Sequence, residues 1–307
     1  MKSKLFGIDE AIATLLADGD SVVLGAALET AIPFAAAHEM IRQQRKGLHL
    51  IAPIADLIGD LLIGAGCINQ VSASWVGNVS AGLGHNYRRA TEHALPHAIG
   101  IHDYSNLALG LALTAGAHGM PFVALKSLLG SDILKSNPHF KIQPDPFSEA
   151  GDPVVLVPAL KPDLAIFCVQ RADEAGNAHL WGSTGVTQEA ALAAERVLII
   201  ADEIVDPEII ASDPSRVLFP GFRVSAVCEL PAASHPAPLT GCWRRDNDFF
   251  HDYHAASREA DGFQAWLAEW ITDMPDHAAY RAKLGARLGK LRITGEAASA
   301  PANYAVA

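Results

Sequence analysis

The stretch that decides the fold is LAIFCVQRADEAGN, residues 164–177. Its first six residues are apolar and predict a strand buried on both faces, and polar side chains then crowd a turn around Gly176. Such strands belong to open parallel sheets, and ligands bind at the carboxyl edge of these sheets. Two interpretations of the turn stand: its groups act on a ligand, or Asp173 and Asn177 only satisfy backbone groups.

The N-terminal region repeats this strand-and-turn pattern beside helices. Apolar residues from Ile8 to Leu16 fit one helix face, and residues 21–24 read as a buried strand. A turn of small residues, Gly25-Ala26-Ala27, follows, and then a second helix that Thr30 can cap and that has Pro33 in its first turn.

Alternating helical and strand signals continue along the chain. They predict an α/β protein with an open, mostly parallel sheet flanked by helices. Further strands are expected at residues 49–53, 68–74, 98–101, 122–124, 154–157, 197–201 and 226–230. Helices are expected at residues 56–63, from about 106 toward 115, and over the apolar stripes at 263–271 and 280–291.

We expect one domain over residues 1–307. Residues 136–152, rich in Pro, Asp and Gly, are predicted to run over the surface. The Ala-rich tail from about residue 294 is predicted to be loose.

Composition excludes several classes of protein. The 307 residues are 50% hydrophobic and 19% charged, which is enough apolar material for a large core. The net charge of -11 and the absence of a basic run argue against nucleic acid as a partner. No apolar run reaches membrane-spanning length, and four widely spaced cysteines suggest buried thiols in a reducing compartment. A soluble, cytoplasmic protein without a membrane partner is expected.

Motifs for metals and for common nucleophiles are missing from the sequence. It has no HExxH, no calcium loop and no GxSxG elbow, and His251 and His254 have no companion ligands near them in sequence. We therefore expect neither a metal nor a bound redox cofactor.

Several candidate groups follow the predicted strands. The turn at Gly25 and Ala26 can present backbone N–H groups to an oxyanion, although close packing explains small residues equally well. Glu29 could be a nucleophile, or an acidic residue favoured near a helix start. DYSN at 103–106 supplies a carboxylate, two hydroxyls and an amide, with Ser105 and Asn106 among them; alternatively, Asp103 or Ser105 only caps a helix.

Three more candidates lie further along the chain. Ser131 stands in a polar turn after Lys126, whose ammonium group could meet a carboxylate or remain solvated. His235 precedes a proline, where a histidine transfers protons less often than it satisfies a loop.

Taken in order, these segments resemble the A subunit of the family I CoA-transferases, most closely the glutaconate CoA-transferase type. The resemblance spans nearly the whole chain. It rests on residues 18–42, DYSN at 103–106, GMPFVALKSLLGSDIL at 119–134, VQRADEAGNAHLWG at 169–182, AAERVLIIADEIV at 193–205, ELPAASHP at 229–236 and DNDFFHDYHAA at 246–256. Two turns depart from the family pattern: Gly25-Ala26-Ala27 lacks the usual glycine pair and aromatic residue, and no glycine precedes Ala233-Ser234-His235-Pro236.

The resemblance implies a homologous B subunit that carries the nucleophilic glutamate, so no catalytic nucleophile is expected on this chain. A CoA thioester is then a substrate rather than a bound cofactor, and a carboxylic acid is the acceptor. Gly25 and Ala26 become oxyanion donors. Ser105, Asn106, Ser131 and Gln170 are expected to orient the acyl group.

Other functions remain open from the sequence. Some relatives hydrolyse a carbon–carbon bond in a cyclic acyl-CoA, so the chain could be the A subunit of a ring-cleaving hydrolase. It could also be a non-catalytic component that binds CoA or organises its partner. Self-sufficient catalysis by Glu29 is a third alternative. Arg88, Arg89 and Lys126 are candidate contacts for the CoA phosphates, or ordinary surface charges.

Overall fold

A computed structural model of the chain describes residues 3–293. The predicted loose tail from about residue 294 lies outside these residues. No helix in the described range is long and apolar enough to cross a membrane.

The strands and helices alternate through most of the chain. The strands are β1 (Ser21–Leu24), β2 (Leu48–Ala55), β3 (Ile68–Asn78), β4 (Gly82–Leu83), β5 (Gly100–Asp103), β6 (Phe122–Leu125), β7 (Lys141–Pro144), β8 (Pro153–Pro158), β9 (Leu164–Ala172), β10 (Ala178–His179), β11 (Arg196–Ile204) and β12 (Ala226–Glu229). The helices are α1 (Ile8–Leu15), α2 (Phe34–Arg42), α3 (Leu57–Gly64), α4 (His85–His93), α5 (Asn106–Ala117), α6 (Ile133–Ser136), α7 (Thr187–Ala193), α8 (Pro207–Ala211), α9 (Asn247–Ala256), α10 (Ala260–Leu267), α11 (His277–Leu284) and α12 (Ala286–Leu291). Short 3₁₀ turns cover Pro214–Arg216 and Gly221–Arg223, and a π-helical turn, Ala268–Thr272, follows α10.

The main sheet has the strand order β12-β11-β9-β1-β2-β3-β4, with β5 also paired to β3 and β10 to β9. All its pairings are parallel except those of the two-residue strands β4 and β10. The predicted α/β class with an open, mostly parallel sheet is confirmed. From β1 the chain adds β2, β3 and β5 on one side, whereas β9, β11 and β12 lie on the other. The strand order therefore reverses between β1 and β9, which is where ligands bind in open α/β sheets.

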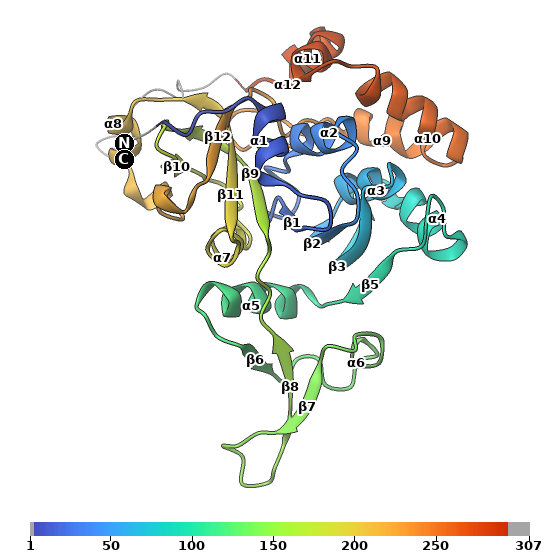
Figure 1. Ribbon diagram of the computed structural model, residues 1–307, viewed down its shortest axis with the longest axis vertical. Helices are drawn as coiled ribbons and strands as arrows, with labels where there is room; N and C mark the ends of the chain where they lie inside the picture. Colours follow the sequence, from blue (N-terminus) through green and yellow to red (C-terminus); the bar gives the residue numbers. More distant parts are fainter. Residues whose placement is uncertain (1–2, 294–307) are drawn as a thin grey trace.

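Helices cover both faces of this sheet (Figure 1). On one face lie α1, α2 and α3, and on the other lie α5 and α7, which pack against each other. A further layer from α9 to α11 lies outside α2 and α3. Because α2 is enclosed between the sheet and this outer layer, nearly all its side chains are buried, including three consecutive alanines, residues 35–37. The sheet core is equally dry, since every residue of β9 is buried.

A second, smaller sheet projects beyond α5 (Figure 1). It has the order β6-β8-β7 and is antiparallel. Residues 122–124 and 154–157 are thus strands, as predicted, but they lie outside the main sheet. Residues 136–152 are mostly exposed, so the predicted surface excursion is confirmed, although it contains the strand β7. Strand β7 is exposed at every position, so no apolar alternation marked it in the sequence.

Several predicted boundaries were shifted. Strand β5 begins two residues later than expected and includes Asp103. Thr30 does not cap α2: the residue before the helix is Pro33, and no side chain caps it. Strand β3 extends four residues beyond Ser74 and turns back into β4, a hairpin that the polar and glycine residues of this region concealed.

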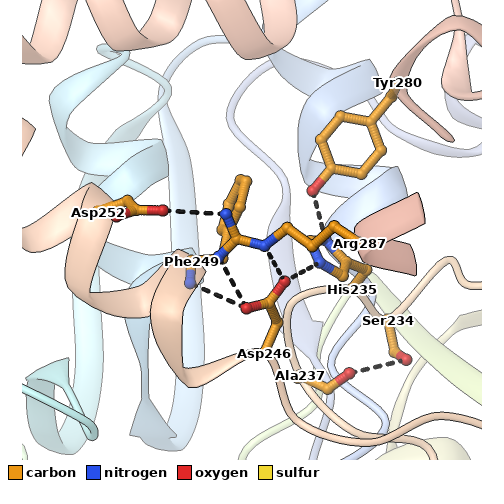
Figure 2. A network of polar contacts seen from close by, with 8 residues as sticks. All are labelled: Ser234, His235, Ala237, Asp246, Phe249, Asp252, Tyr280 and Arg287. Atoms are coloured by element: carbon orange, nitrogen blue, oxygen red, sulfur yellow. Dashed lines mark hydrogen bonds and ion pairs between the residues drawn. The ribbon is translucent and has the colours of Figure 1, made fainter. Parts of the chain in front are cut away.

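The C-terminal helices are tied to the loop after β12 by a buried polar network (Figure 2). His235 Nδ1 lies 2.6 Å from the Tyr280 hydroxyl, and its Nε2 lies 3.1 Å from Asp246 Oδ2. Arg287 donates to both oxygens of Asp246, at 2.6 and 2.8 Å. Burial lowers the pKa of His235. His235 therefore satisfies hydrogen-bonding groups around a buried loop. This is the second of its two interpretations, the one without proton transfer.

Candidate active site

The turn after β1 lies at the point where the strand order reverses. Gly25 has φ +61°, and a β-carbon there would lie 3.0 Å from the Ile32 α-carbon, so this position favours glycine. Its N–H donates to the carbonyl oxygen of Ile166 in β9, at 3.1 Å. The role of Gly25 as an oxyanion donor stays a prediction, and its N–H is already engaged because the ladder between β1 and β9 continues one residue past Leu24. Within residues 3–293, the N–H of Ala26 makes no hydrogen bond.

A glycine-flanked loop, residues 182–186, lies directly against this turn. Val186 N–H donates to the Ala26 carbonyl oxygen at 2.9 Å. Gly185 has φ +52°, and a β-carbon there would overlap the same oxygen. At the other end, a β-carbon on Gly182 would overlap the Thr240 side chain. The loop is therefore packed against the protein at both ends.

Gln170 holds the start of this loop. Its side chain is fully buried in β9. Nε2 donates to the carbonyl oxygens of Trp181 and Thr240, at 3.0 and 3.1 Å, and Oε1 accepts from Trp181 N–H at 3.3 Å. A glutamine amide has two N–H donors, and both are used here. Direct substrate contact by Gln170 stays a prediction, and within this chain the buried side chain already uses both N–H donors.

Ser183 and Thr184, at the centre of the loop, were missed by sequence reasoning. Neither hydroxyl makes a hydrogen bond within the described part of the chain, and Ser183 is exposed. The pattern Gly-Ser-Thr-Gly after a buried strand could have indicated them, but the intervening hairpin of β9 with β10 hid their connection to the strand edge.

Asn106 approaches the same loop from α5. It lies one helical turn before Gly110. Gly110 packs closely against Val186, since a β-carbon added to Gly110 would lie 3.2 Å from Val186 Cγ1. Asn106 is exposed, and its Oδ1 accepts from the Ser74 hydroxyl at 2.5 Å. Ser105 is the N-cap of α5, since its hydroxyl oxygen accepts from Ala108 N–H at 3.1 Å. The capping interpretation of Ser105 is thus confirmed, and its hydroxyl proton is left to donate elsewhere.

Ser131 and Lys126 lie on the smaller sheet and the loop that leaves it. The Ser131 hydroxyl donates to the Leu128 carbonyl oxygen at 2.7 Å. Lys126 pairs with Asp145 across this sheet, at 3.5 Å. Arg88 pairs with Glu92 one turn along α4, and Arg89 donates to the Arg258 carbonyl oxygen. These cations thus have local partners.

The two acidic candidates have different surroundings. Glu29 is exposed on the turn after β1. In the turn after β9, Asp173 Oδ1 accepts from the N–H groups of Ala175 and Asn177, both at 2.9 Å, and Asn177 Nδ2 donates to Oδ2 at 2.7 Å. These bonds form an ordinary turn in which Asp173 satisfies backbone N–H groups. That is one of the two interpretations that the sequence left open.

Neither an accessible reactive thiol nor a metal-ligand cluster is found among residues 3–293. Burial raises the pKa of Cys67, Cys228 and Cys242 to about 12 each, so these thiols stay protonated near neutral pH. Between residues 3 and 293, no three His, Cys, Asp or Glu side chains are grouped so that they could hold a metal ion. Near the reversal point, the described groups without a hydrogen-bond partner include the N–H of the buried Ala26 and the hydroxyls of Ser183 and Thr184, and the amide of Asn106 is exposed.

Comparison with known proteins identifies the family to which this chain belongs. The pattern of the family described as "Coenzyme A transferase" matches residues 7–230. The chain is 40% identical over 282 residues to the A subunit of the 3-oxoadipate CoA-transferase from Pseudomonas knackmussii, covering 92% of this chain and 98% of that one. It is 30% identical to the A subunit of the glutaconate CoA-transferase from Acidaminococcus fermentans, covering 95% of each chain.

Structure gives the same result. The crystal structure of the Acidaminococcus fermentans glutaconate CoA-transferase superposes with a TM-score of 0.90 over 99% of both chains, at 28% identity. The similarity to the cholesterol ring-cleaving hydrolase IpdA subunit of Rhodococcus jostii is more distant, with 23% identity over 53% of this chain. Sequence and fold agree over nearly the full length, and the chain belongs to the coenzyme A transferase family.

Proposed function

We propose that this chain is the A subunit of a heteromeric CoA-transferase and that its acyl substrate is a short dicarboxylate. The similar proteins from Pseudomonas knackmussii and Acidaminococcus fermentans are named for 3-oxoadipate and glutaconate, both dicarboxylates. The observation that carries the proposal is the Ala26 N–H, an unengaged donor at the reversal point between β1 and β9.

The reaction needs a carboxylate nucleophile, which we assign to a homologous B subunit. That carboxylate attacks the thioester carbon of the acyl-CoA, and the CoA thiolate leaves to give an acyl-glutamyl anhydride. The thiolate then attacks the glutamyl carbonyl, releases the first acid and leaves a glutamyl-CoA thioester. A second acid reverses these steps and carries CoA away, so one difficult exchange becomes several easier ones.

Each attack produces an oxyanion, and this chain supplies donors to it. The backbone is held on both sides of the Ala26 N–H, because Gly25 N–H donates to Ile166 and the Ala26 carbonyl oxygen accepts from Val186. A fixed donor costs no reorganisation in the transition state, and removal of one such donor typically lowers the rate by about 10² to 10³. We assign the orientation of the acyl group to Asn106 and the Ser105 hydroxyl, at the start of α5. For Ser131 we retain the proposal of an acyl contact made when a partner closes the site.

Exposed apolar side chains at the carboxyl edge of the sheet support docking of the B subunit there. Leu28 follows β1, Leu107 begins α5, and Trp75 and Leu83 lie in the hairpin of β3 and β4; their exposed fractions are 39%, 54%, 38% and 53%. An exposed group of large apolar residues marks an interaction surface. We keep the cytoplasm as the expected location, since the four cysteines are unpaired and buried.

Trapping of the covalent intermediate tests the proposal. The chain is purified with its B partner, incubated with a dicarboxylic acyl-CoA, treated with borohydride and analysed by mass spectrometry. A reduced glutamate on the partner supports transfer, and a sample without acyl-CoA is the control. No adduct, with the thioester retained and the acyl carbon skeleton changed, would instead support the ring-cleaving hydrolase. A complex that binds CoA without either change would support the non-catalytic role.

A further inference from the structure

The centre of the loop at 182–186 holds two hydroxyls that the proposed mechanism has not used. Ser183 and Thr184 are consecutive, and neither hydroxyl has a partner within residues 3–293. In the free chain, solvent can satisfy these hydroxyls, since Ser183 is exposed. The loop is nevertheless fixed on both sides of the pair, so the two hydroxyls are held in place for a ligand.

The fixing contacts are specific. Before the pair, the buried Gln170 amide makes three hydrogen bonds that join Trp181 to Thr240. After the pair, Thr187 N–H donates to the Thr184 carbonyl oxygen at 3.0 Å, and Val186 N–H donates to Ala26. Gln170 is thus a positioning residue for the loop. A site whose supporting groups are buried and fully bonded is preorganised for a ligand.

The position of the pair relative to Ala26 indicates what it binds. Gly185 touches Ala26, and Ser183 is two residues away, so Ser183 lies within about 7 Å of the Gly185 α-carbon. With the reacting carbonyl beside the turn at Ala26, the second carboxylate of a short diacid can reach the hydroxyls of the pair.

The chemistry of the pair also fits a carboxylate. Each hydroxyl supplies one O–H donor, and a carboxylate has two acceptor oxygens. Hydrogen bonds from a hydroxyl to an ionised oxygen are short and strong. Neutral donors also release their ligand more readily than a buried cation would, which suits an enzyme that must exchange one acid for another.

We infer that Ser183 and Thr184 bind the non-reacting carboxylate of the acyl substrate and so select dicarboxylates. This inference rests on the proposed CoA-transferase function and names residues for its substrate choice. It assigns to this chain the specificity for the remote end of the acid, while the partner carries the nucleophile for the reacting end.

The test compares two acceptors of equal chain length, glutarate and valerate, in the complex of this chain with its B partner. The variants are Ser183→Ala and Thr184→Val, with Thr184→Ser as the rescue that restores the hydroxyl. Thr91→Val, an exposed threonine on α4, is the matched control. Circular dichroism and thermal unfolding verify that each variant is folded.

We expect each hydroxyl deletion to raise the KM for glutarate by about 10- to 100-fold with little change in kcat, since one hydrogen bond to a charged group is lost. Values for valerate should stay near those of the wild type, and Thr184→Ser should restore glutarate. Three results would overturn the inference while leaving CoA transfer intact. They are equal effects of a variant on both acids, unchanged glutarate kinetics in the variants, and a wild type that does not prefer glutarate over valerate. A wild-type complex that transfers CoA to neither acid would overturn the proposed function, and this inference with it.

Discussion

Gly185 and Ala26 touch across the point where the strand order of the main sheet reverses. The Gly185 α-carbon packs against the Ala26 carbonyl oxygen, and the next residue, Val186, donates its N–H to that oxygen at 2.9 Å. This contact joins the turn after β1 to the loop that follows β9 and β10. The two segments are 159 positions apart in sequence (185 minus 26) and become neighbours only because β1 pairs with β9.

Gly185→Ala should therefore damage both stability and activity. The positive φ costs about 1–2 kcal/mol for an L-residue, and displacement of Ala26 adds about 1–3 kcal/mol. Urea unfolding measures the stability, and kcat/KM in the assembled complex measures the activity.

The control for this substitution is Gly151→Ala. Gly151 also has positive φ, at +67°, but its β-carbon would meet nothing within 4 Å. Only the conformational cost should appear, with kcat/KM near the wild-type value. Equal loss of activity in both variants would contradict the role of the contact with Ala26.

Asp246→Asn should weaken the attachment of the C-terminal helices (Figure 2). Although burial raises its pKa, hydrogen bonds from His235 and Arg287 hold the pKa of Asp246 below its ordinary value. The neutral amide leaves Arg287 without its buried counter-charge, at a cost of about 3 kcal/mol in the free energy of unfolding. Thermal and urea unfolding of the two proteins measure this loss.

Asp252→Asn is the matched control, because Asp252 also pairs with Arg287, at 3.0 Å, but is 61% exposed. An exposed ion pair contributes about 1 kcal/mol or less. If the two variants lose equal stability, burial does not decide the strength of this network.

Stability should fall as the pH drops from about 6.5 toward 4. Burial is the main cause that lowers the pKa of His277 to about 4, from an unfolded value of 6.5. His49, beside His102 and His139, is lowered to about 4 as well, again mainly by burial. In this window the unfolded chain binds protons that the folded chain excludes, so unfolding is favoured as the pH falls.

His277→Gln tests this prediction. Each such histidine contributes a slope of up to about 1.4 kcal/mol per pH unit, and the variant should lose one such contribution. Urea unfolding at several pH values between 7 and 4 gives the slope, with His251→Gln, an exposed histidine on α9, as the control. An unchanged slope would show that His277 titrates alike in both states.

Glu29→Gln should leave CoA transfer unchanged in the assembled complex. Glu29 is exposed, and no hydrogen bond within residues 3–293 orients its carboxylate. Borohydride trapping should still modify the partner and leave residue 29 unmodified. A reduced adduct at Glu29 in the wild type, absent in the variant, would instead assign the nucleophile to this chain.

The sequence predicted the strands of the main sheet best where burial is two-sided. Residues 164–169 and 197–201 are apolar throughout, and both lie inside longer parallel strands. Helix α3 was also predictable, since Asp56 caps it by accepting from Leu57 N–H. Strand β7 and the β3–β4 hairpin were not, because exposed or glycine-rich strands have no apolar periodicity.

The candidate site was only partly accessible to sequence reasoning. The small-residue turn at Gly25 was found because it directly follows a strand. The sequence offered both Gly25 and Ala26 as donors, and only the pairing of β1 with β9 reveals that Ile166 already accepts the Gly25 N–H. The contacts of Gln170 were hidden for a similar reason: its hydrogen-bond partners lie up to 70 residues away in sequence.

By itself, the sequence determined the buried strands and the helices with an apolar face, because side-chain periodicity and local capping act over a few residues. It also determined, through resemblance, the coenzyme A transferase family. Only the tertiary structure decided which donors remain free for a ligand. A hydrogen bond uses up its donor, and in this protein the partners that use up Gly25 and Gln170, and that leave Ala26, Ser183 and Thr184 unengaged, come from distant parts of the chain.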